Sequence, residues 1–113
     1  MDCLFCKIVN REIPADIVYE DDQVLAFNDI NPQAPTHVLI VPKRHIATLN
    51  DLEQDDLGLV GQLSFAAARM AKDYGFAEDG YRVVMNCNEK GGQSVYHVHM
   101  HLMGGRRFTW PAG

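Results

Sequence analysis

The sequence predicts an α+β fold, in which a mainly antiparallel five-stranded sheet combines with one long helix and one short helix. The prediction rests on several short apolar segments separated by turn-forming residues, and on one long segment whose apolar residues recur at helical spacing. With 113 residues, 47% of them hydrophobic, the chain has the size and apolar content of one globular domain covering residues 1–113.

The first half of the chain predicts the short helix followed by three strands. Residues Ile17–Glu20 and Val24–Phe27 are rich in apolar side chains and are split by the polar segment Asp21–Gln23, which has the length of a hairpin turn. The segment His37–Val41 is a β-branched run with a proline near each end. Because proline is excluded from the interior of a central strand, this third strand is expected to end sharply.

The second half predicts the long helix and two further strands. The apolar residues at helical spacing are Leu57, Val60, Leu63, Ala67, Met70 and Tyr74. Gly75 follows them directly and is a typical stop signal for a helix. Two more apolar segments, Arg82–Asn86 and Val95–Met103, are expected to be strands separated by the turn-forming segment Asn88–Gly92.

Charge and hydropathy exclude several classes of partner. The formal net charge of -5 does not suit a protein that holds a polyanionic duplex, so we expect no nucleic-acid partner. No apolar run approaches the roughly 18 residues needed to span a bilayer, so we expect no membrane partner and a cytoplasmic location. A domain this small gains core by pairing with a second copy, which makes a homodimer a natural expectation.

The three cysteines do not form a disulfide framework, because two of them lie only three residues apart in Cys3-Leu4-Phe5-Cys6. Three interpretations of this Cys-x-x-Cys pair stay open. It is half of a metal site, a redox pair, or two small buried hydrophobic residues. The redox interpretation calls for a preceding strand, and none is predicted there.

The most informative segment holds three alternating histidines, His97, His99 and His101. On a strand, residues two apart share a face, so the three imidazoles are expected to point one way. The apolar residues between and after them are Val98, Met100 and Leu102, which are expected to cover the helix on the other face. Three polar rings on one face cost stability unless they are hydrogen-bonded or functional.

Two chemistries suit such a row of imidazoles. Three histidines bind a catalytic zinc ion with one position left for water. Alternatively, one imidazole is a nucleophile, which needs neighbours that fix its tautomer and donors around the reacting atom. The preceding segment Gly91–Ser94 suits the second chemistry, because its glycines let the backbone approach a phosphate and its amide and hydroxyl groups donate hydrogen bonds.

The segment His97–Met103 follows the pattern His-φ-His-φ-His-φ-φ, where φ is apolar, and the sequence resembles the histidine triad family. The other segments that carry the resemblance are Phe5–Ile8, Ile13–Pro14, Leu25–Phe27 with Asp29–Ile30, Pro32–His37, Pro42–His45, Gly91–Tyr96, Gly104–Arg106 and Trp110–Pro111. The tail looks like that of the Hint-like, phosphoramidase branch. The resemblance implies a histidine triad fold in a homodimer whose two five-stranded sheets join into one.

The resemblance also implies an activity, the hydrolysis of the P–N bond in purine nucleoside 5′-phosphoramidates. His99 looks like the nucleophile that forms a nucleotidyl-histidine, which water then cleaves. By the same resemblance His101 orients His99 through its backbone carbonyl, and His37 supports His101. Ser94 is placed to help protonate the leaving amine, and His97 is free to act near the leaving group if it holds no metal.

Nucleotide contacts are carried over in the same way. Asn86, Gln93 and Ser94 resemble phosphate contacts, alongside His99 and His101. Asp29 is similar to the family carboxylate that accepts from both ribose hydroxyls. The apolar residues that match the family's purine wall, and that would look the same in an ordinary core, are Phe5, Ile8, Ile13, Phe27 and Ile30.

A second site is suggested by Cys3, Cys6, His45 and His97, a Cys₂His₂ set of the kind that structural zinc favours. Some histidine triad relatives, including the galactose-1-phosphate uridylyltransferases, bind zinc with such a set. The zinc expected here is structural, and the chemistry itself needs no cofactor. Three functions therefore stay open: the nucleotidyl-histidine hydrolase, a metal-dependent phosphohydrolase with three histidine ligands, and a non-catalytic nucleotide-binding adaptor.

Overall fold

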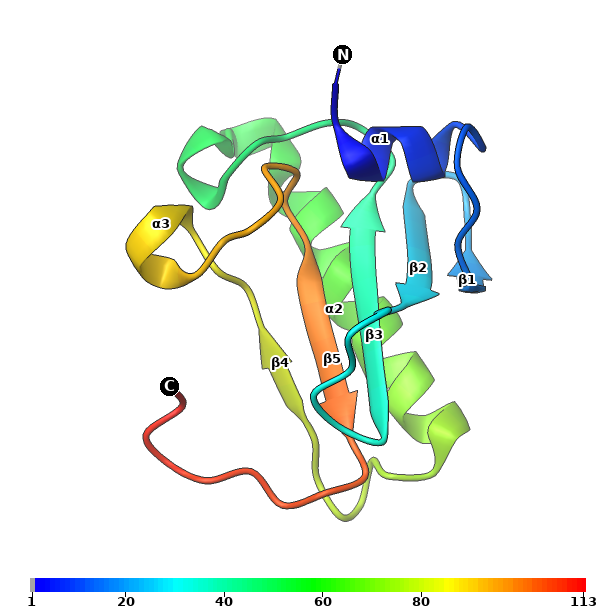
Figure 1. Ribbon diagram of the computed structural model, residues 1–113, viewed down its shortest axis with the longest axis vertical. Helices are drawn as coiled ribbons and strands as arrows, with labels where there is room; N and C mark the ends of the chain where they lie inside the picture. Colours follow the sequence, from blue (N-terminus) through cyan, green and yellow to red (C-terminus); the bar gives the residue numbers. More distant parts are fainter. Residues whose placement is uncertain (1) are drawn as a thin grey trace.

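A computed structural model describes residues 2–113, so Met1, the first residue of the expected domain, lies outside the described residues. The strands are β1 (Ile17–Glu20), β2 (Val24–Asn28), β3 (Thr36–Pro42), β4 (Arg82–Val84) and β5 (Met100–Gly104). The helices are α1 (Leu4–Val9), α2 (Leu57–Tyr74) and α3 (Asn88–Gly91), with short 3₁₀ turns at Leu49–Asp51 and Gln54–Asp56. The five strands form one antiparallel sheet in the order β1-β2-β3-β5-β4, which confirms the predicted fold class (Figure 1).

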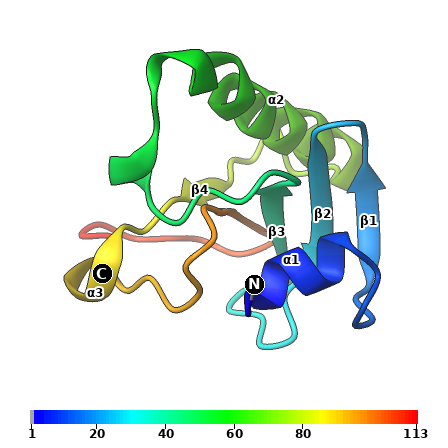
Figure 2. The ribbon, with the colours of Figure 1, turned by 90° about the horizontal axis from the view of Figure 1, so that it is seen from above.

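The two faces of the sheet are covered by different helices. Seen from above, α2 lies along one face and α1 lies on the other (Figure 2). Strand β3 is buried on both faces: Val38 and Ile40 pack with α2, whereas Leu39 and Val41 pack with α1. Because side chains alternate along a strand, His37 shares the α1 face with Leu39.

The long helix α2 begins and ends where the sequence predicts. Its C-terminus is closed by Gly75, whose φ of 89° lies in the left-handed region that glycine adopts readily. The backbone N–H of this glycine donates to the carbonyls of Ala71 and Lys72. The residues that α2 buries against the sheet are Leu63, Ala66, Ala67, Met70 and Ala71.

The predicted strand Val95–Met103 is wrong at its beginning, because β5 starts only at Met100. Before that point the chain leaves the sheet ladder, and the N–H of Val98 donates to the carbonyl of Ile46 at 2.7 Å. His97 and His99 therefore precede the strand, and only His101 lies on it. The alternation still holds for the apolar partners, since Val98, Met100 and Leu102 all lie in the core beneath α2.

Two smaller differences concern the neighbouring segment. Strand β4 ends at Val84 instead of Asn86. The predicted turn at Asn88–Gly92 contains the single-turn helix α3, which is closed by Gly92 at a φ of 86°. Among the described residues, no helix is long and apolar enough to cross a membrane.

Candidate functional site

His97 is fully buried, and its ring is fixed by the end of β3. Its Nε2–H donates to the carbonyl of Pro42 at 2.7 Å. In a neutral imidazole one nitrogen carries the hydrogen and the other a lone pair. The lone pair of His97 is therefore on Nδ1, and this atom faces the two cysteines of the N-terminal segment.

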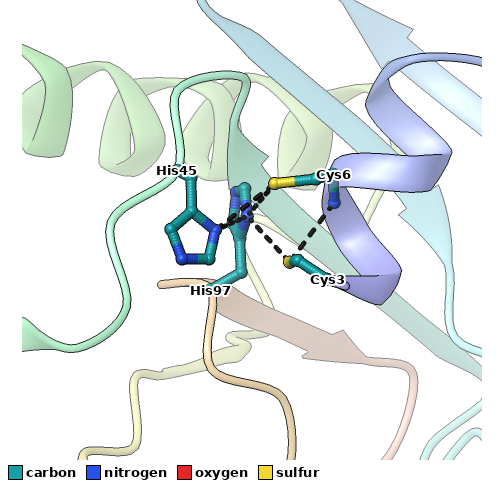
Figure 3. Close-up of side chains that lie close together, drawn as sticks. All are labelled: Cys3, Cys6, His45 and His97. Carbon is teal, nitrogen blue, oxygen red and sulfur yellow. Dashed lines mark hydrogen bonds between the residues drawn. The ribbon is translucent and has the colours of Figure 1, made fainter. Parts of the chain in front are cut away.

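The predicted Cys₂His₂ set comes together at one end of the sheet (Figure 3). The Nδ1 atom of His97 lies 3.5 Å from Sγ of Cys3 and 3.6 Å from Sγ of Cys6. The Nδ1 atom of His45 lies 3.3 Å from Sγ of Cys6 and 3.2 Å from Nδ1 of His97. Ligand atoms around a tetrahedral zinc ion are separated by about 3.3–3.8 Å, as follows from Zn–N and Zn–S distances of about 2.0–2.3 Å. The four side chains thus fit such an ion.

Three separate segments of the chain supply these four residues. Cys3 caps the N-terminus of α1, where its Sγ accepts from the N–H of Cys6 at 3.4 Å. His45 follows β3, and His97 precedes β5. Burial, reinforced by Cys3, raises the pKa of the Cys6 thiol to about 11. A metal ion bound here would displace thiol protons, because thiolates are the form that binds metals.

His99 is oriented by the residue two positions before it. Its Nδ1–H donates to the backbone carbonyl of His97 at 2.7 Å, which leaves the lone pair on Nε2. Its ring also lies edge-on to Phe5, with centroids 5.1 Å apart. This corrects the expectation that the carbonyl of His101 orients His99. Because the chain reaches β5 only after His99, it is the carbonyl of His97 that meets the ring.

A chain of hydrogen bonds leads to His101 from the loop before β3. The backbone N–H of Gln33 donates to Nδ1 of His37 at 3.0 Å, so the hydrogen of the neutral His37 ring is on Nε2. That Nε2–H donates to Nδ1 of His101 at 2.9 Å. The hydrogen of His101 is consequently on its own Nε2. The carboxylate Oδ2 of Asp29 lies 3.4 Å from Nε2 of His37.

These two rings stay neutral at neutral pH. Burial, together with the nearby His99 and His37 rings, lowers the pKa of His101 to about 4. Burial also lowers the pKa of His37, and the charge of Asp29 opposes this change. Neutral rings have defined tautomers, so the order of donors and acceptors described above holds near pH 7.

Gln93 does not fit the predicted role of a phosphate contact. Its side-chain Nε2 donates to the carbonyls of Ala47 at 2.8 Å and Val95 at 3.1 Å, and its Oε1 accepts from the N–H of Asn88 at 2.8 Å. The side chain is also buried. Since both amide hydrogens are used inside the protein, Gln93 holds the α3 segment in place instead of donating to a ligand.

The other predicted phosphate contacts lie on either side of α3. Asn86 follows β4, and its Nδ2 lies 4.0 Å from the position that a Cβ atom would take on Gly92. Ser94 follows the same glycine turn and is exposed. The turn therefore brings Asn86 next to the glycines that precede Ser94.

The predicted apolar wall separates into two environments. Phe5, Ile8 and Phe27 are buried in the cluster beneath α1, and Ile13 packs against that cluster. Ile30 is fully exposed in the loop after β2. Its neighbour Asp29 is partly buried and stabilises this loop, because its Oδ1 accepts from the N–H of Asn31 at 2.8 Å.

The structure adds groups that sequence reasoning missed. They are the carbonyls of Pro42 and His97 and the amide of Gln33, each of which fixes one histidine ring. All three are backbone groups, which almost every residue carries, so no residue type signals them in the sequence.

Comparisons with known proteins agree with this architecture. A family model described as the HIT domain matches residues 10–108. The chain is 55% identical over 105 residues to the purine nucleoside phosphoramidase of Escherichia coli (strain K12). The aligned region covers 93% of this chain and 88% of that protein. The crystal structure of a HIT family hydrolase from Legionella pneumophila Philadelphia 1 superposes with a TM-score of 0.98 at 56% identity, covering 99% of this chain and 100% of that one. A histidine triad protein from Clostridium difficile gives a TM-score of 0.93 at 48% identity, covering 96% and 95%.

Proposed function

Since the chain belongs to the HIT domain family, we propose that it hydrolyses purine nucleoside 5′-phosphoramidates through a covalent nucleotidyl-histidine intermediate. The observation that carries this proposal is the fixed tautomer of His99, whose Nδ1–H is held by the His97 carbonyl at 2.7 Å. A neutral imidazole with its lone pair on Nε2 is a competent nucleophile near pH 7. The name of the Escherichia coli relative gives the substrate class.

In the first step Nε2 of His99 attacks the α-phosphorus and the P–N bond breaks. The departing amine takes up a proton from the Ser94 hydroxyl, which is exposed and takes a proton from solvent water in turn. The nucleotidyl-imidazole carries positive charge, which the carbonyl of His97 stabilises through Nδ1–H. The Nε2–H of His101 donates to a phosphoryl oxygen, and its direction is set by His37.

In the second step water attacks the same phosphorus, and nucleoside monophosphate leaves as neutral His99 is restored. Asn86 contributes to binding the phosphate, and Asp29 accepts from the ribose hydroxyls. The exposed Ile30 and the partly buried Ile13 form the side of the purine site nearest the surface, backed by Phe5, Ile8 and Phe27.

The arrangement of lone pairs argues against one metal ion held by the three triad histidines. The Nδ1 lone pair of His97 faces the cysteines, and Nδ1 of His101 faces His37. Three ligands of one catalytic ion would have to converge on a common point. The nucleophile mechanism requires only the lone pair on Nε2 of His99 to reach the substrate.

We also propose that Cys3, Cys6, His45 and His97 hold a structural zinc ion. Four protein ligands leave no open position for substrate, so the ion would tie α1 to the ends of β3 and β5 and take no part in the reaction. The carbonyl that receives Nε2–H of His97 is the outer partner that zinc-binding histidines usually have.

A homodimer is proposed as well. Strand β4 is at one edge of the sheet, and its Val83 is 44% exposed. On α2, Leu57 and Phe65 are each 65% exposed. Pairing of β4 with its counterpart in a second copy would join the two sheets and cover apolar surface. Light scattering that reports a monomer at micromolar concentration would contradict the dimer.

The function is tested by intact-protein mass spectrometry during turnover of an adenosine 5′-phosphoramidate. Acid quenching should trap a mass increase of one adenylyl group in the wild-type chain, and the His99→Ala variant should show none. Turnover without any adduct, under conditions where hydrolysis of the adduct is the slow step, would rule out the nucleophile. Tight nucleotide binding without turnover would favour the non-catalytic adaptor.

A further inference from the structure

The loop between β2 and β3 supplies the amide that begins the chain of hydrogen bonds to His101. Its residues 30–33 are exposed, so burial does not hold this loop in place. Within the loop, Nε2 of the Gln33 side chain donates to the carbonyl of Asn31 at 3.1 Å. The position of the Gln33 amide decides which nitrogen of His37 carries the hydrogen.

Arg106, near the C-terminus, forms a hydrogen bond with the same residue of the loop, Gln33. The Nε atom of Arg106 donates to the backbone carbonyl of Gln33 at 2.9 Å. This carbonyl and the amide that meets His37 belong to the two peptide planes on either side of the Gln33 Cα atom, so a bond to the carbonyl fixes one of these planes and leaves the amide fewer conformations. The sequence separation is 73 residues, which makes the contact a purely tertiary one.

The Arg106 side chain is itself held in position. Its guanidinium lies 4.1 Å from the centroid of the Phe108 ring, and its Nη1 donates to the carbonyl of Arg107 at 3.0 Å. A cation over an aromatic face is attracted by the ring. The donor that reaches Gln33 is therefore restrained at its own end.

Gly105, the residue before Arg106, allows the C-terminal tail (residues 105–113) to lie close to the loop. Gly105 has a φ of 94°, and a Cβ atom there would lie 2.9 Å from Cβ of Pro35. Any other residue would be strained in this conformation and would push the tail away from the loop. The close approach at Pro35 and the hydrogen bond at Gln33 together form one contact between the tail and the loop.

We propose that Arg106 is a positioning residue of the active site, which holds the Gln33 amide against His37 and so keeps the Nε2–H of His101 directed at the reacting phosphate. The proposal rests on the proposed hydrolase function. Without Arg106 the loop would sample other conformations, and His37 would exchange between its two neutral tautomers. His101 would then present a lone pair to the phosphate for part of the time.

The test compares Arg106→Met with Arg107→Met, which removes the same charge from the adjacent, exposed position. Imidazole nitrogen shifts from NMR at pH 7 report the tautomers of His37 and His101. In the wild type and in Arg107→Met, both Nδ1 atoms should give the shift of a lone-pair nitrogen. In Arg106→Met, His37 and His101 should give shifts averaged between the two tautomers.

Kinetics supply the second readout. We expect Arg106→Met to lower kcat about tenfold with KM changed less than about threefold, since the ground state keeps its other contacts. Arg106→Lys should restore most of the rate, because its ammonium group can also donate to the Gln33 carbonyl. Melting temperatures of the variants identify any loss through unfolding, and Gly105→Ala, which keeps Arg106, should cause the same averaging of the tautomers.

Unchanged tautomers and unchanged kcat in Arg106→Met would overturn the proposal, as would an equal effect of Arg107→Met. The tautomer measurement does not depend on turnover. If the wild-type chain proves inactive toward phosphoramidates, the hydrolase proposal fails while the shifts still decide whether Arg106 positions His37.

Discussion

Two clusters of metal-binding residue types lie near the nucleophile, and they behave differently. Cys3, Cys6, His45 and His97 form one, and Asp29, His37 and His101 form the other; within each set the ligand atoms lie within 4.8 Å of one another. In the first, a backbone carbonyl takes the outer hydrogen of His97, so a lone pair points into the cluster. In the second, a backbone amide donates to the outer nitrogen of His37, so a hydrogen points into the cluster.

The comparison shows that residue type alone does not make a metal site. A ring whose outer nitrogen donates to a carbonyl can bind a cation, whereas a ring whose outer nitrogen accepts from an amide passes a hydrogen bond onward. The first cluster is therefore suited to hold an ion, and the second to orient a donor. His99 lies between them. It is hydrogen-bonded to the backbone carbonyl of His97, and the centroid of its ring is 5.0 Å from that of the His101 ring.

The largest effect is expected at the residue between the clusters. His99→Ala should reduce phosphoramidate turnover by about a thousandfold or more, because it removes the nucleophile. Affinity for adenosine monophosphate should change less than about threefold, since most of its proposed contacts are made by other residues, such as Asp29 and Asn86. Steady-state kinetics and calorimetric titration measure the two quantities. A mechanism with three metal ligands predicts instead that His97→Ala and His101→Ala are as damaging as His99→Ala and that all three lose metal.

Removing a thiol should affect the first cluster alone. We expect about one zinc per chain in the wild type, and well under half of that in Cys6→Ser. The melting temperature of this variant should fall by about 10 °C or more, since an ion bound only by the native state adds several kcal/mol to stability.

Cys87→Ser is the matched control, because Cys87 belongs to neither cluster. It should leave both the metal content and the melting temperature unchanged. Elemental analysis that finds no zinc in wild-type protein never exposed to chelator would refute the structural ion, and the hydrolase proposal would stand.

The second cluster should show the reverse pattern. His37→Ala removes the donor to Nδ1 of His101, and we expect kcat to fall by about ten- to a hundredfold. The zinc content should stay at the wild-type level, because His37 is not one of the four residues of the first cluster. Loss of metal in this variant would mean that the two clusters are not independent.

The smallest effect concerns stability at acid pH. The pKa of His101 is lowered from 6.5 to about 4 by burial and by the facing His99 and His37 rings, with Asp29 opposing. Between pH 7 and pH 5 the unfolded chain therefore binds more protons at this site than the folded chain does. The free energy of unfolding should therefore be lower at pH 5 than at pH 7. The expected difference is about 1 kcal/mol after allowance for the partial exposure of the ring.

Urea denaturation at pH 7 and pH 5 measures this change. His101→Gln should show a smaller loss than the wild type over the same interval, because the titrating ring is gone. An equal loss in both proteins would assign the pH dependence to other groups, such as His37, whose pKa is also lowered by burial.

Much of the fold could be predicted from the sequence. Apolar periodicity located α2 and its glycine stop, and it placed Val98, Met100 and Leu102 under that helix. Residue chemistry also indicated the Cys₂His₂ set, because two cysteines and two histidines are the ligands that structural zinc favours and both residue types are few in this chain. These properties belong to side chains, and side chains are what a sequence records.

The errors arose where backbone geometry decides. Alternation alone extended the last strand back to Val95, but the chain joins the ladder only at Met100, because Val98 pairs with Ile46 outside the sheet. Gln93 looked like a phosphate donor by type, yet two carbonyls use its hydrogens.

The sequence by itself determined which residues are able to bind a metal, attack phosphorus or donate a proton. The tertiary structure decided which of them do so, because it brings the Pro42 carbonyl to His97 and the Gln33 amide to His37. Amides and carbonyls are the same at almost every residue, so their partners depend on where the folded chain places them. The tautomer of each histidine, and with it the chemistry of each cluster, is therefore a property of the fold.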